Sequence, residues 1–205
     1  MNAWRERTSR WLRPIAVRTP LSPNALTILA VGFSLAAAVS LFLAPADPNR
    51  FLHAVGLFAV GGALDLLDGA VARAQGKTSR FGDFLDHFLD RVSDLAVTAG
   101  WIIGSGSRLA IGLPALVAIM LNGYIGTQIE ATFRTRTYEA TGRAEFVLAM
   151  ITFPIIAWIL AVSETSRASL LGLTTVDWLT LLLGLFALVG IAQRLREARR
   201  LSGAA

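Results

Sequence analysis

The sequence contains no cysteine, only two histidines and few charged residues. Without cysteine the chain can form no disulfide framework, thiol nucleophile or cysteine-ligated zinc site. Of its 205 residues, 54% are hydrophobic and 16% are charged, and the mean hydropathy is +0.58. This composition is too apolar for a solvated globular surface. The sequence therefore indicates an integral membrane protein.

The N-terminus does not have the pattern of a cleavable signal peptide, since arginines interrupt it before any apolar run begins. Within residues 1–20, Trp4, Trp11 and Ile15 fall near one helical face, with Arg10 and Arg13 toward the other. This pattern predicts a juxtamembrane amphipathic helix that lies in the interface, with its arginines on anionic headgroups. A frayed basic tail is the alternative.

Six apolar stretches follow, each with about the 20 residues that cross a hydrocarbon core. They cover residues 24–44, 51–72, 82–103, 109–129, 144–162 and 170–192. The predicted fold is an all-α integral membrane protein with six transmembrane helices plus the N-terminal interfacial amphipathic helix. The six helices form one domain over residues 21–193, and a basic cytoplasmic tail covers residues 194–205.

Arginine and lysine gather on one side of these six spans. Fifteen of the nineteen lie in the N-terminal segment, residues 73–80, residues 134–143 and the C-terminal tail, whereas the other side has only Arg50, Arg108 and Arg167. Short cytoplasmic loops are enriched in basic residues. The chain is therefore predicted to lie in the cell membrane with both termini on the cytoplasmic side. The net charge of +5 arises from this segregation, so no nucleic-acid partner is expected.

Six of the fourteen acidic residues lie between Asp65 and Asp94. Asp65 and Asp68 are three apart, and Asp86, Asp90 and Asp94 are four apart, so each set forms a polar stripe on one helical face. A carboxylate at mid-depth in a membrane costs about 2.5–3.5 kcal/mol on insertion scales. A cation must offset this cost, and a set of oxygen ligands suits Mg²⁺ or Mn²⁺, as one or two ions.

The second and third spans are expected to form an antiparallel pair joined by residues 73–81. At about 1.5 Å per residue, Asp65 and Asp68 reach the same depths as Asp90 and Asp86. The four carboxylates would then face each other just inside the cytoplasmic edge.

Small residues and one arginine flank these carboxylates. Gly69, Ala72 and Gly82 leave room for a ligand near the backbone, and Arg73 offers a planar fork for phosphate oxygens. This combination suggests metal-assisted chemistry on a phosphate ester, with a free carboxylate taking a proton from an attacking hydroxyl. A solvated polar face without chemistry is the alternative.

The stretch Asp65-x2-Asp68-Gly69-x2-Ala72-Arg73-x8-Gly82-x3-Asp86-x3-Asp90 resembles the signature of the CDP-alcohol phosphotransferases at all eight fixed positions. The resemblance implies an enzyme of phospholipid biosynthesis that moves a phosphatidyl-type group from a CDP-linked lipid to a small alcohol and releases CMP.

The resemblance also implies a role for each residue. Asp65, Asp68 and Asp86 would bind metal, and Asp90 would complete the metal site and act as the catalytic base. The CDP moiety would be contacted by Asp68, Gly69, Ala72, Arg73 and Gly82. Asn24 and Thr27 resemble the family's common opening and would line the nucleotide pocket, or they simply cap a helix.

Basic residues near the fifth span favour an anionic acceptor. They are Lys77, Arg134, Arg136 and Arg143. Arg143-Ala-Glu145 is similar to the Arg-x-Glu-Arg stretch of the branch that uses inositol 1-phosphate, although Phe146 stands at the second arginine position. That branch makes phosphatidylinositol phosphate or its archaeal ether-lipid counterpart. Glycerol 3-phosphate, giving phosphatidylglycerol phosphate, is the alternative acceptor.

Two other classes use clustered carboxylates. A membrane prenyltransferase has two Asp-x-x-Asp motifs far apart in sequence, and a divalent-cation transporter has carboxylates near the midplane.

The family resemblance also implies a homodimer. Its packing would be assisted by the small residues Gly100, Gly104, Gly123 and Gly126.

Three polar residues lie outside the signature. Asp83 is expected to be a solvated acid in a first helical turn, and Asp94 a hydrogen-bonding partner for Arg91. His87 is expected to pack or form hydrogen bonds rather than bind metal.

Overall fold

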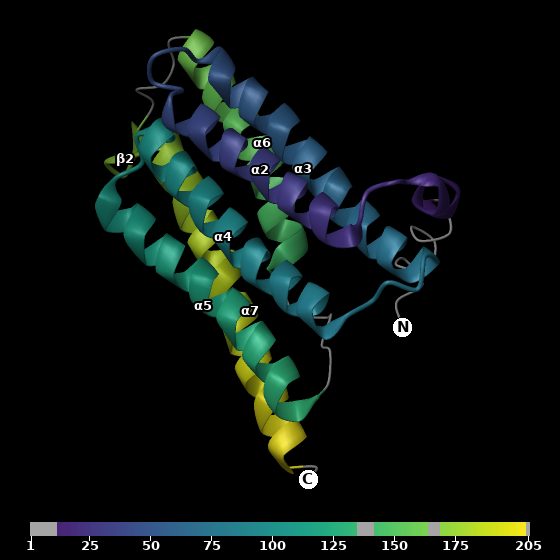
Figure 1. The fold of residues 1–205 in the computed structure, drawn as a ribbon. Helices are drawn as coiled ribbons and strands as arrows, with labels where there is room; N and C mark the ends of the chain where they lie inside the picture. The colour runs from purple at the N-terminus through teal and green to yellow at the C-terminus, as the bar shows by residue number, and fades with distance from the viewer. Residues whose placement is uncertain (1–11, 135–141, 164–168, 204–205) are drawn as a thin grey trace.

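In the residues that the structure describes, the protein is a bundle of six long helices with one small hairpin (Figure 1). A computed structural model describes residues 12–134, 142–163 and 169–203. The helices are α2 (Pro23–Phe42), α3 (Asn49–Ala74), α4 (Arg80–Ser105), α5 (Leu109–Phe133), α6 (Arg143–Val162) and α7 (Thr175–Gly203). The hairpin consists of β1 (Ser169–Leu170) and β2 (Leu173–Thr174).

Serine side chains cap the N-termini of α2 and α4, the helices before and after α3. Ser22 accepts a hydrogen bond from the Ala25 amide, and Pro23 takes the first helical position of α2, where no backbone donor is lost. Ser79 accepts from the Gly82 amide and begins α4. The caps therefore fix where each helix starts relative to its functional residues.

Five helices, α2, α3, α5, α6 and α7, are long and apolar enough to cross a membrane. α4 has the same 26-residue length as α3, but its first fifteen residues hold four aspartates and two arginines. The described part of the chain therefore has five apolar candidate spans, and α4 is not among them because of its charged first half. Large apolar side chains exposed on these helices, such as Ile28, Leu113 and Leu148, suit contact with lipid rather than water.

α2 lies between α3 and α4 and packs against both, while α5 and α7 lie side by side (Figure 1). α3 and α4 are not among the closely packed helix pairs, so the expected antiparallel pair does not pack along its length, although its carboxylates do meet near the joining loop. The reason is α4's glycine face. A Cβ added at Gly100 or Gly104 would overlap the α2 backbone at Ala38 or Leu41, so α4 can approach α2 closely.

The segment before α2 is tied to the end of α3. Residues 12–18 are helical, and Ala16 is fully buried with Leu26, Ala70 and Val71. The Gln75 side-chain amide donates to the carbonyls of Ala16 at 3.1 Å and of Thr19 at 3.0 Å. Trp4, Arg10 and Trp11 lie outside the described residues.

The last helix starts later and ends later than the sequence pattern predicts. The predicted span begins at residue 170, but Leu171 (φ 54°) and Gly172 (φ 75°) form a left-handed turn that joins β1 to β2, as paired positive φ angles do in tight hairpins. α7 therefore begins at Thr175 and continues to Gly203.

Asp177 locks this hairpin to the loop before α5. Its buried carboxylate accepts from the amides of Arg108 at 2.9 Å and Thr174 at 3.0 Å. It also lies 3.4 Å from Arg108 Nε. These contacts join segments about 70 positions apart in the sequence.

Asp177→Ala is expected to lower the unfolding free energy by about 3 kcal/mol, because it leaves buried donors unpaired. For a chain of this size the melting temperature in detergent would fall by about 6–12 °C. Asp47→Ala is the matched control, since Asp47 accepts one amide hydrogen bond, from Asn49 at 3.0 Å. Equal melting shifts in the two variants would contradict the proposed lock.

Candidate active site

Three aspartates from two helices meet at one end of the bundle. Asp65 and Asp68 of α3 and Asp86 of α4 each offer a carboxylate oxygen, and these oxygens all lie within 4.8 Å of one another. Asp68 is buried, and the other two are half-buried. Among the described residues, none of the three forms an ion pair with a lysine, arginine or histidine. Three unneutralised carboxylates so close together fit a hard divalent cation.

Asp68 is held in place by α2. The Thr27 hydroxyl donates a hydrogen bond of 2.6 Å to Asp68 Oδ2, and both residues are buried. Thr27 also contacts the Pro23 carbonyl at 3.1 Å, one turn earlier. Thr27 therefore orients a carboxylate of the cluster in addition to its place in the first turns of α2.

The small residues of the motif face polar side chains. A Cβ added at Gly69 would lie 3.1 Å from Arg73 Nη1, so the exposed Arg73 guanidinium sits over this glycine. A Cβ added at Gly82 would lie 3.3 Å from Asn24 Oδ1. The glycines thus make the room that brings Arg73 and Asn24 close to the backbone.

Ala72 closes the same turn of α3. Its carbonyl accepts from the Lys77 amide at 2.9 Å, which starts the loop to α4. The CDP-binding residues predicted from the signature therefore lie at the α3 end, the α4 start and the first turns of α2.

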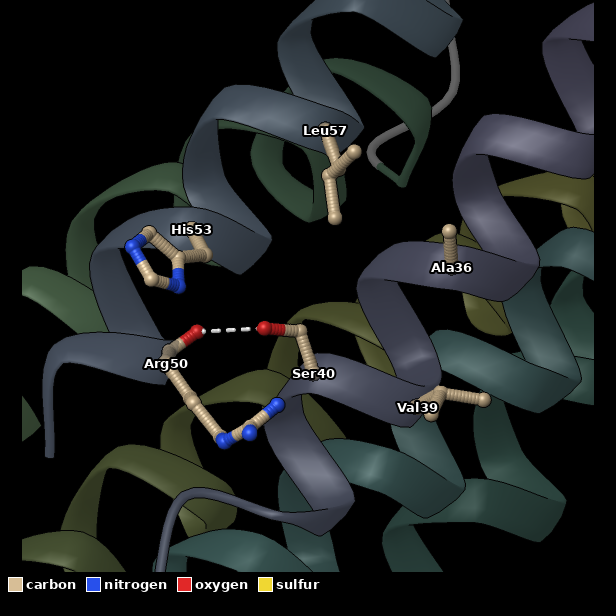
Figure 2. Close-up of a pocket in the computed structure, with 6 residues that line it drawn as sticks. All are labelled: Ala36, Val39, Ser40, Arg50, His53 and Leu57. Atoms are coloured by element: carbon tan, nitrogen blue, oxygen red, sulfur yellow. Dashed lines mark hydrogen bonds between the residues drawn. The ribbon is translucent and has the colours of Figure 1, made fainter. Parts of the chain in front are cut away.

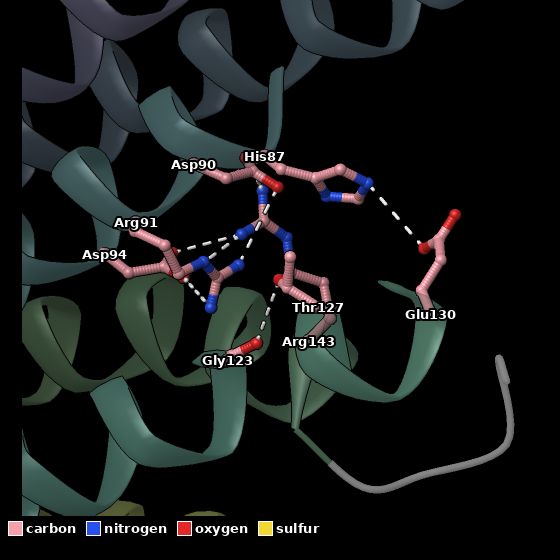
Figure 3. Close-up of polar contacts among 8 residues, drawn as sticks. All are labelled: His87, Asp90, Arg91, Asp94, Gly123, Thr127, Glu130 and Arg143. Carbon is pink, nitrogen blue, oxygen red and sulfur yellow. Dashed lines mark hydrogen bonds and ion pairs between the residues drawn. The ribbon is translucent and has the colours of Figure 1, made fainter. Parts of the chain in front are cut away.

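Asp90 is not among the three carboxylates whose oxygens all lie within 4.8 Å of one another, so its predicted part in the metal site stays a prediction. Its carboxylate is contacted by Arg143 (Figure 3). Arg143 Nη2 donates to Asp90 Oδ1 at 2.6 Å, and Arg143 Nη1 lies 3.1 Å from Asp94 Oδ1. Arg91 Nη1 lies 3.1 Å from Asp94 Oδ2, which confirms the predicted Asp94–Arg91 contact. The structure therefore places a predicted acceptor-binding arginine directly on the predicted catalytic base.

The glycines of α5 make room for two arginines. A Cβ added at Gly123 would overlap the Arg91 guanidinium, and one at Gly126 would overlap that of Arg194. Arg194 Nε donates to the buried Asn122 at 3.0 Å. Together with Gly100 and Gly104, these glycines face segments of their own chain. They do not supply the surface for a second copy that the sequence suggested, and the homodimer stays a prediction.

Gly123→Ala is expected to lower activity about ten-fold, because the added methyl displaces Arg91 from Asp94 and removes a charged hydrogen bond. Stability should change little, since alanine favours a helix by about 1 kcal/mol over glycine. Gly32→Ala is the matched control, because nothing lies within 4 Å of its added Cβ. Measurement of the melting temperature and the initial rate separates the two effects. Full activity of Gly123→Ala would contradict a role for the Arg91 position.

The remaining predicted acceptor residues are not drawn into this cluster. Lys77 and Arg134 are exposed, and in residues 12–134, 142–163 and 169–203 neither pairs with Asp65, Asp68, Asp86 or Asp90. Arg136 lies outside the described residues. Arg194 was not among the predicted site residues. The sequence signal for it is a polar face on α5, where Asn122, Gly123 and Gly126 interrupt an apolar span.

A second acidic group lies on another face of α4. Asp83, His87 and Glu130 offer ligand atoms within 4.8 Å of one another, and His87 Nε2 is 3.7 Å from Glu130 Oε2 (Figure 3). Asp83 is exposed in the first turn of α4, as predicted. His87 interacts with a carboxylate of α5 and does not join the Asp65–Asp68–Asp86 cluster.

Comparison with known proteins decides what this constellation belongs to. The family model for CDP-alcohol phosphatidyltransferase matches residues 20–191. The chain belongs to this family. A CDP-alcohol phosphatidyltransferase is an enzyme of phospholipid biosynthesis, and the match covers the whole acidic motif. It supports neither the prenyltransferase nor the divalent-cation transporter.

Relatives of this CDP-alcohol phosphatidyltransferase include two synthases of phosphorylated inositol lipids. Phosphatidylinositol phosphate synthase of Mycobacteroides abscessus is 31% identical over 213 residues, which cover 98% of this chain and 89% of that relative. Archaetidylinositol phosphate synthase of Pyrococcus horikoshii is 38% identical over 104 residues, which cover 51% of this chain and 53% of that relative.

The fold of this CDP-alcohol phosphatidyltransferase is also that of solved structures. The Mycobacterium tuberculosis phosphatidylinositol phosphate synthase with CDP-DAG bound has a TM-score of 0.68 and 27% identity, over 92% of this chain and 94% of that one. The same protein in complex with manganese and citrate has a TM-score of 0.67 and 29% identity, over 91% and 88%. A divalent metal thus occurs in this fold.

Proposed function

We propose that this enzyme transfers a phosphatidyl-type group from a CDP-linked lipid, CDP-diacylglycerol or CDP-archaeol, to inositol 1-phosphate and releases CMP. The names of the relatives support this acceptor over glycerol 3-phosphate. The observation that carries the proposal is the 2.6 Å contact between Arg143 and Asp90. It puts a cation suited to an acceptor phosphate beside the group that would take the acceptor's proton.

The proposed placement in the membrane follows from the helices and their charges. α4 would be the sixth transmembrane helix, since it equals α3 in length and its charged first half lies beside α3 carboxylates. Both termini and the acidic cluster would be cytoplasmic, and the N-terminal helix would lie in the interface. A homodimer is proposed from the family resemblance.

The donor diphosphate would bind at the cluster of Asp65, Asp68 and Asp86. These residues would hold Mg²⁺ or Mn²⁺, as one or two ions, and a metal bound there would neutralise charge on the diphosphate and its leaving group. Arg73 over Gly69 would bind a phosphate oxygen, and Asn24 beside Gly82 would contact the nucleotide. The acyl or isoprenoid chains would stay in the bilayer beside the apolar helix faces.

Asp90 would act on the acceptor. Its carboxylate would take the proton from the attacking hydroxyl, whose oxygen then bonds to the lipid-bearing phosphorus. The bond from that phosphorus to the CMP oxygen breaks, and CMP leaves with the electron pair. Proton transfer of this kind contributes about 10²–10⁴-fold to a rate.

Arg143 would change partners when the acceptor binds. In the structure it spans Asp90 and Asp94, and an acceptor phosphate would compete with Asp90 for the same guanidinium. Asp90 would then be released to accept the proton. Arg194, held against Gly126 by Asn122, offers a second cation on α5, and Lys77, Arg134 and Arg136 would add positive charge at the entrance.

The experiment is CMP release from CDP-diacylglycerol by purified protein with Mg²⁺, with inositol 1-phosphate, glycerol 3-phosphate or serine supplied one at a time. CMP release with inositol 1-phosphate alone is the expected outcome. Release with glycerol 3-phosphate but not inositol 1-phosphate would overturn the acceptor and keep the reaction class. Binding of neither lipid nor metal would overturn both.

A further inference from the structure

A pocket opens between α2 and α3, near the start of α3 (Figure 2). Its volume is about 590 Å³, within the range of ligand pockets. Arg50 precedes Asp65 by fifteen residues, so the two lie about 22 Å apart along α3. The pocket is therefore separate from the candidate active site. It is lined by Ala36, Val39 and Ser40 of α2 and by Arg50, His53 and Leu57 of α3.

The lining residues are sorted by depth. Arg50, His53 and Leu57 follow one face of α3 at helical spacing, with the two basic side chains near the helix start and the leucine about 10 Å further along. On α2, Ser40 lies beside the basic end, and Ala36 lies one turn deeper (Figure 2). The pocket thus has a cationic mouth and an apolar wall that runs toward the middle of the bundle.

The positive charge at this mouth is not neutralised by the protein that the structure describes. The Ser40 hydroxyl donates to the Arg50 backbone carbonyl at 2.9 Å, which leaves the guanidinium unused. In the described part of the chain that guanidinium has no hydrogen bond or ion pair. Arg108, at the same end of the bundle, is paired with buried Asp177. Of these two arginines, only Arg50 has a guanidinium without a partner among the described residues, so it is available to bind an anionic ligand.

We propose that this pocket binds one anionic phospholipid of the leaflet opposite the active site. The phosphate lies between Arg50, whose fork matches phosphate oxygens, and His53, which has an N–H donor in either charge state. One acyl chain follows Ala36, Val39 and Leu57 into the bilayer. Val39 and His53 are exposed, so a lipid can enter sideways from the membrane.

The test is lipid retention by the purified full-length chain, measured by native mass spectrometry. The protein is titrated in detergent with phosphatidylglycerol or with phosphatidylcholine of the same chain length. We expect one phosphatidylglycerol to be retained with at least about ten-fold preference, because phosphatidylcholine has the same phosphate but adds a quaternary ammonium, which the cationic mouth repels. Arg50→Gln should remove this preference. Ala36→Phe, which fills the apolar wall, should reduce retention of both lipids.

The control is Arg199→Gln, which removes the same charge from an exposed site near the end of α7 and should leave retention unchanged. Equal losses in Arg199→Gln and Arg50→Gln would overturn the proposal, because they would indicate general charge attraction. Displacement of the lipid by millimolar inorganic phosphate would also overturn it, since the site would then select the free ion. So would a change of oligomeric state in Ala36→Phe without loss of lipid, which would make the pocket an interface between copies.

Discussion

Asp86→Asn is expected to lower CMP release by about a thousand-fold or more. The oxygens of Asp65, Asp68 and Asp86 lie within 4.8 Å of one another, so loss of one charge removes a ligand and weakens the whole site. A metal ion stabilises a phosphoryl-transfer transition state by several kcal/mol, and each 1.36 kcal/mol is about ten-fold in rate. Chelation of the wild-type enzyme should reproduce the loss.

The measurement is the initial rate of CMP release over a range of Mg²⁺ or Mn²⁺ concentrations. Asp83→Asn is the matched control, because Asp83 lies one turn earlier on the same helix, outside the three-carboxylate cluster. Its rate should stay near that of the wild type. If Asp86→Asn kept full activity at low metal concentration, the cluster would not be the metal site.

Asp90→Asn is expected to lower the rate of the chemical step by about 10²–10⁴-fold, the usual contribution of a positioned base. Binding of metal and CDP-lipid should be preserved, because the carboxylate of Asp90 lies outside the cluster and contacts Arg143 at 2.6 Å. The asparagine can still accept a hydrogen bond from Arg143 but cannot take a proton.

Single-turnover CMP release and CDP-lipid affinity should be measured on the same preparation. Asp94→Asn provides the comparison, since Asp94 lies one turn further along and contacts the same arginine at 3.1 Å. Its effect on the chemical step should be much smaller. Equal loss of lipid affinity and rate in Asp90→Asn would instead assign Asp90 to metal or donor binding.

Local periodicity explains why the acidic cluster could be predicted from sequence. Asp65 and Asp68 share a helical face because they are three apart, and a loop of fixed length brings Asp86 to a similar depth. No such rule gives the partner of Asp90. Arg143 is 53 positions away, and only the packing of α4 against α6 brings it near.

The choice of neighbouring helices likewise could not be predicted from the sequence. An antiparallel α3–α4 pair follows from their short connection, but the glycine face of α4 selects α2 as its neighbour. The start of α7 depends on the Asp177 contacts, which join segments far apart in the chain. The hydropathy of the segment from residue 170 indicates an apolar run but gives no sign of the turn at Leu171 and Gly172.

The contact of α4 with the α2 backbone at Gly100 and Gly104 bears on how turnover depends on temperature. A glycine in such a contact has no side chain to repack, so we expect α2 and α4 to move together and to keep Thr27 and Asp86 at a fixed separation. Little reorganisation of the protein is then needed at each cycle. We then expect lateral diffusion of lipid to and from the bundle to limit turnover. The rate of turnover should therefore rise as the surrounding bilayer becomes more fluid.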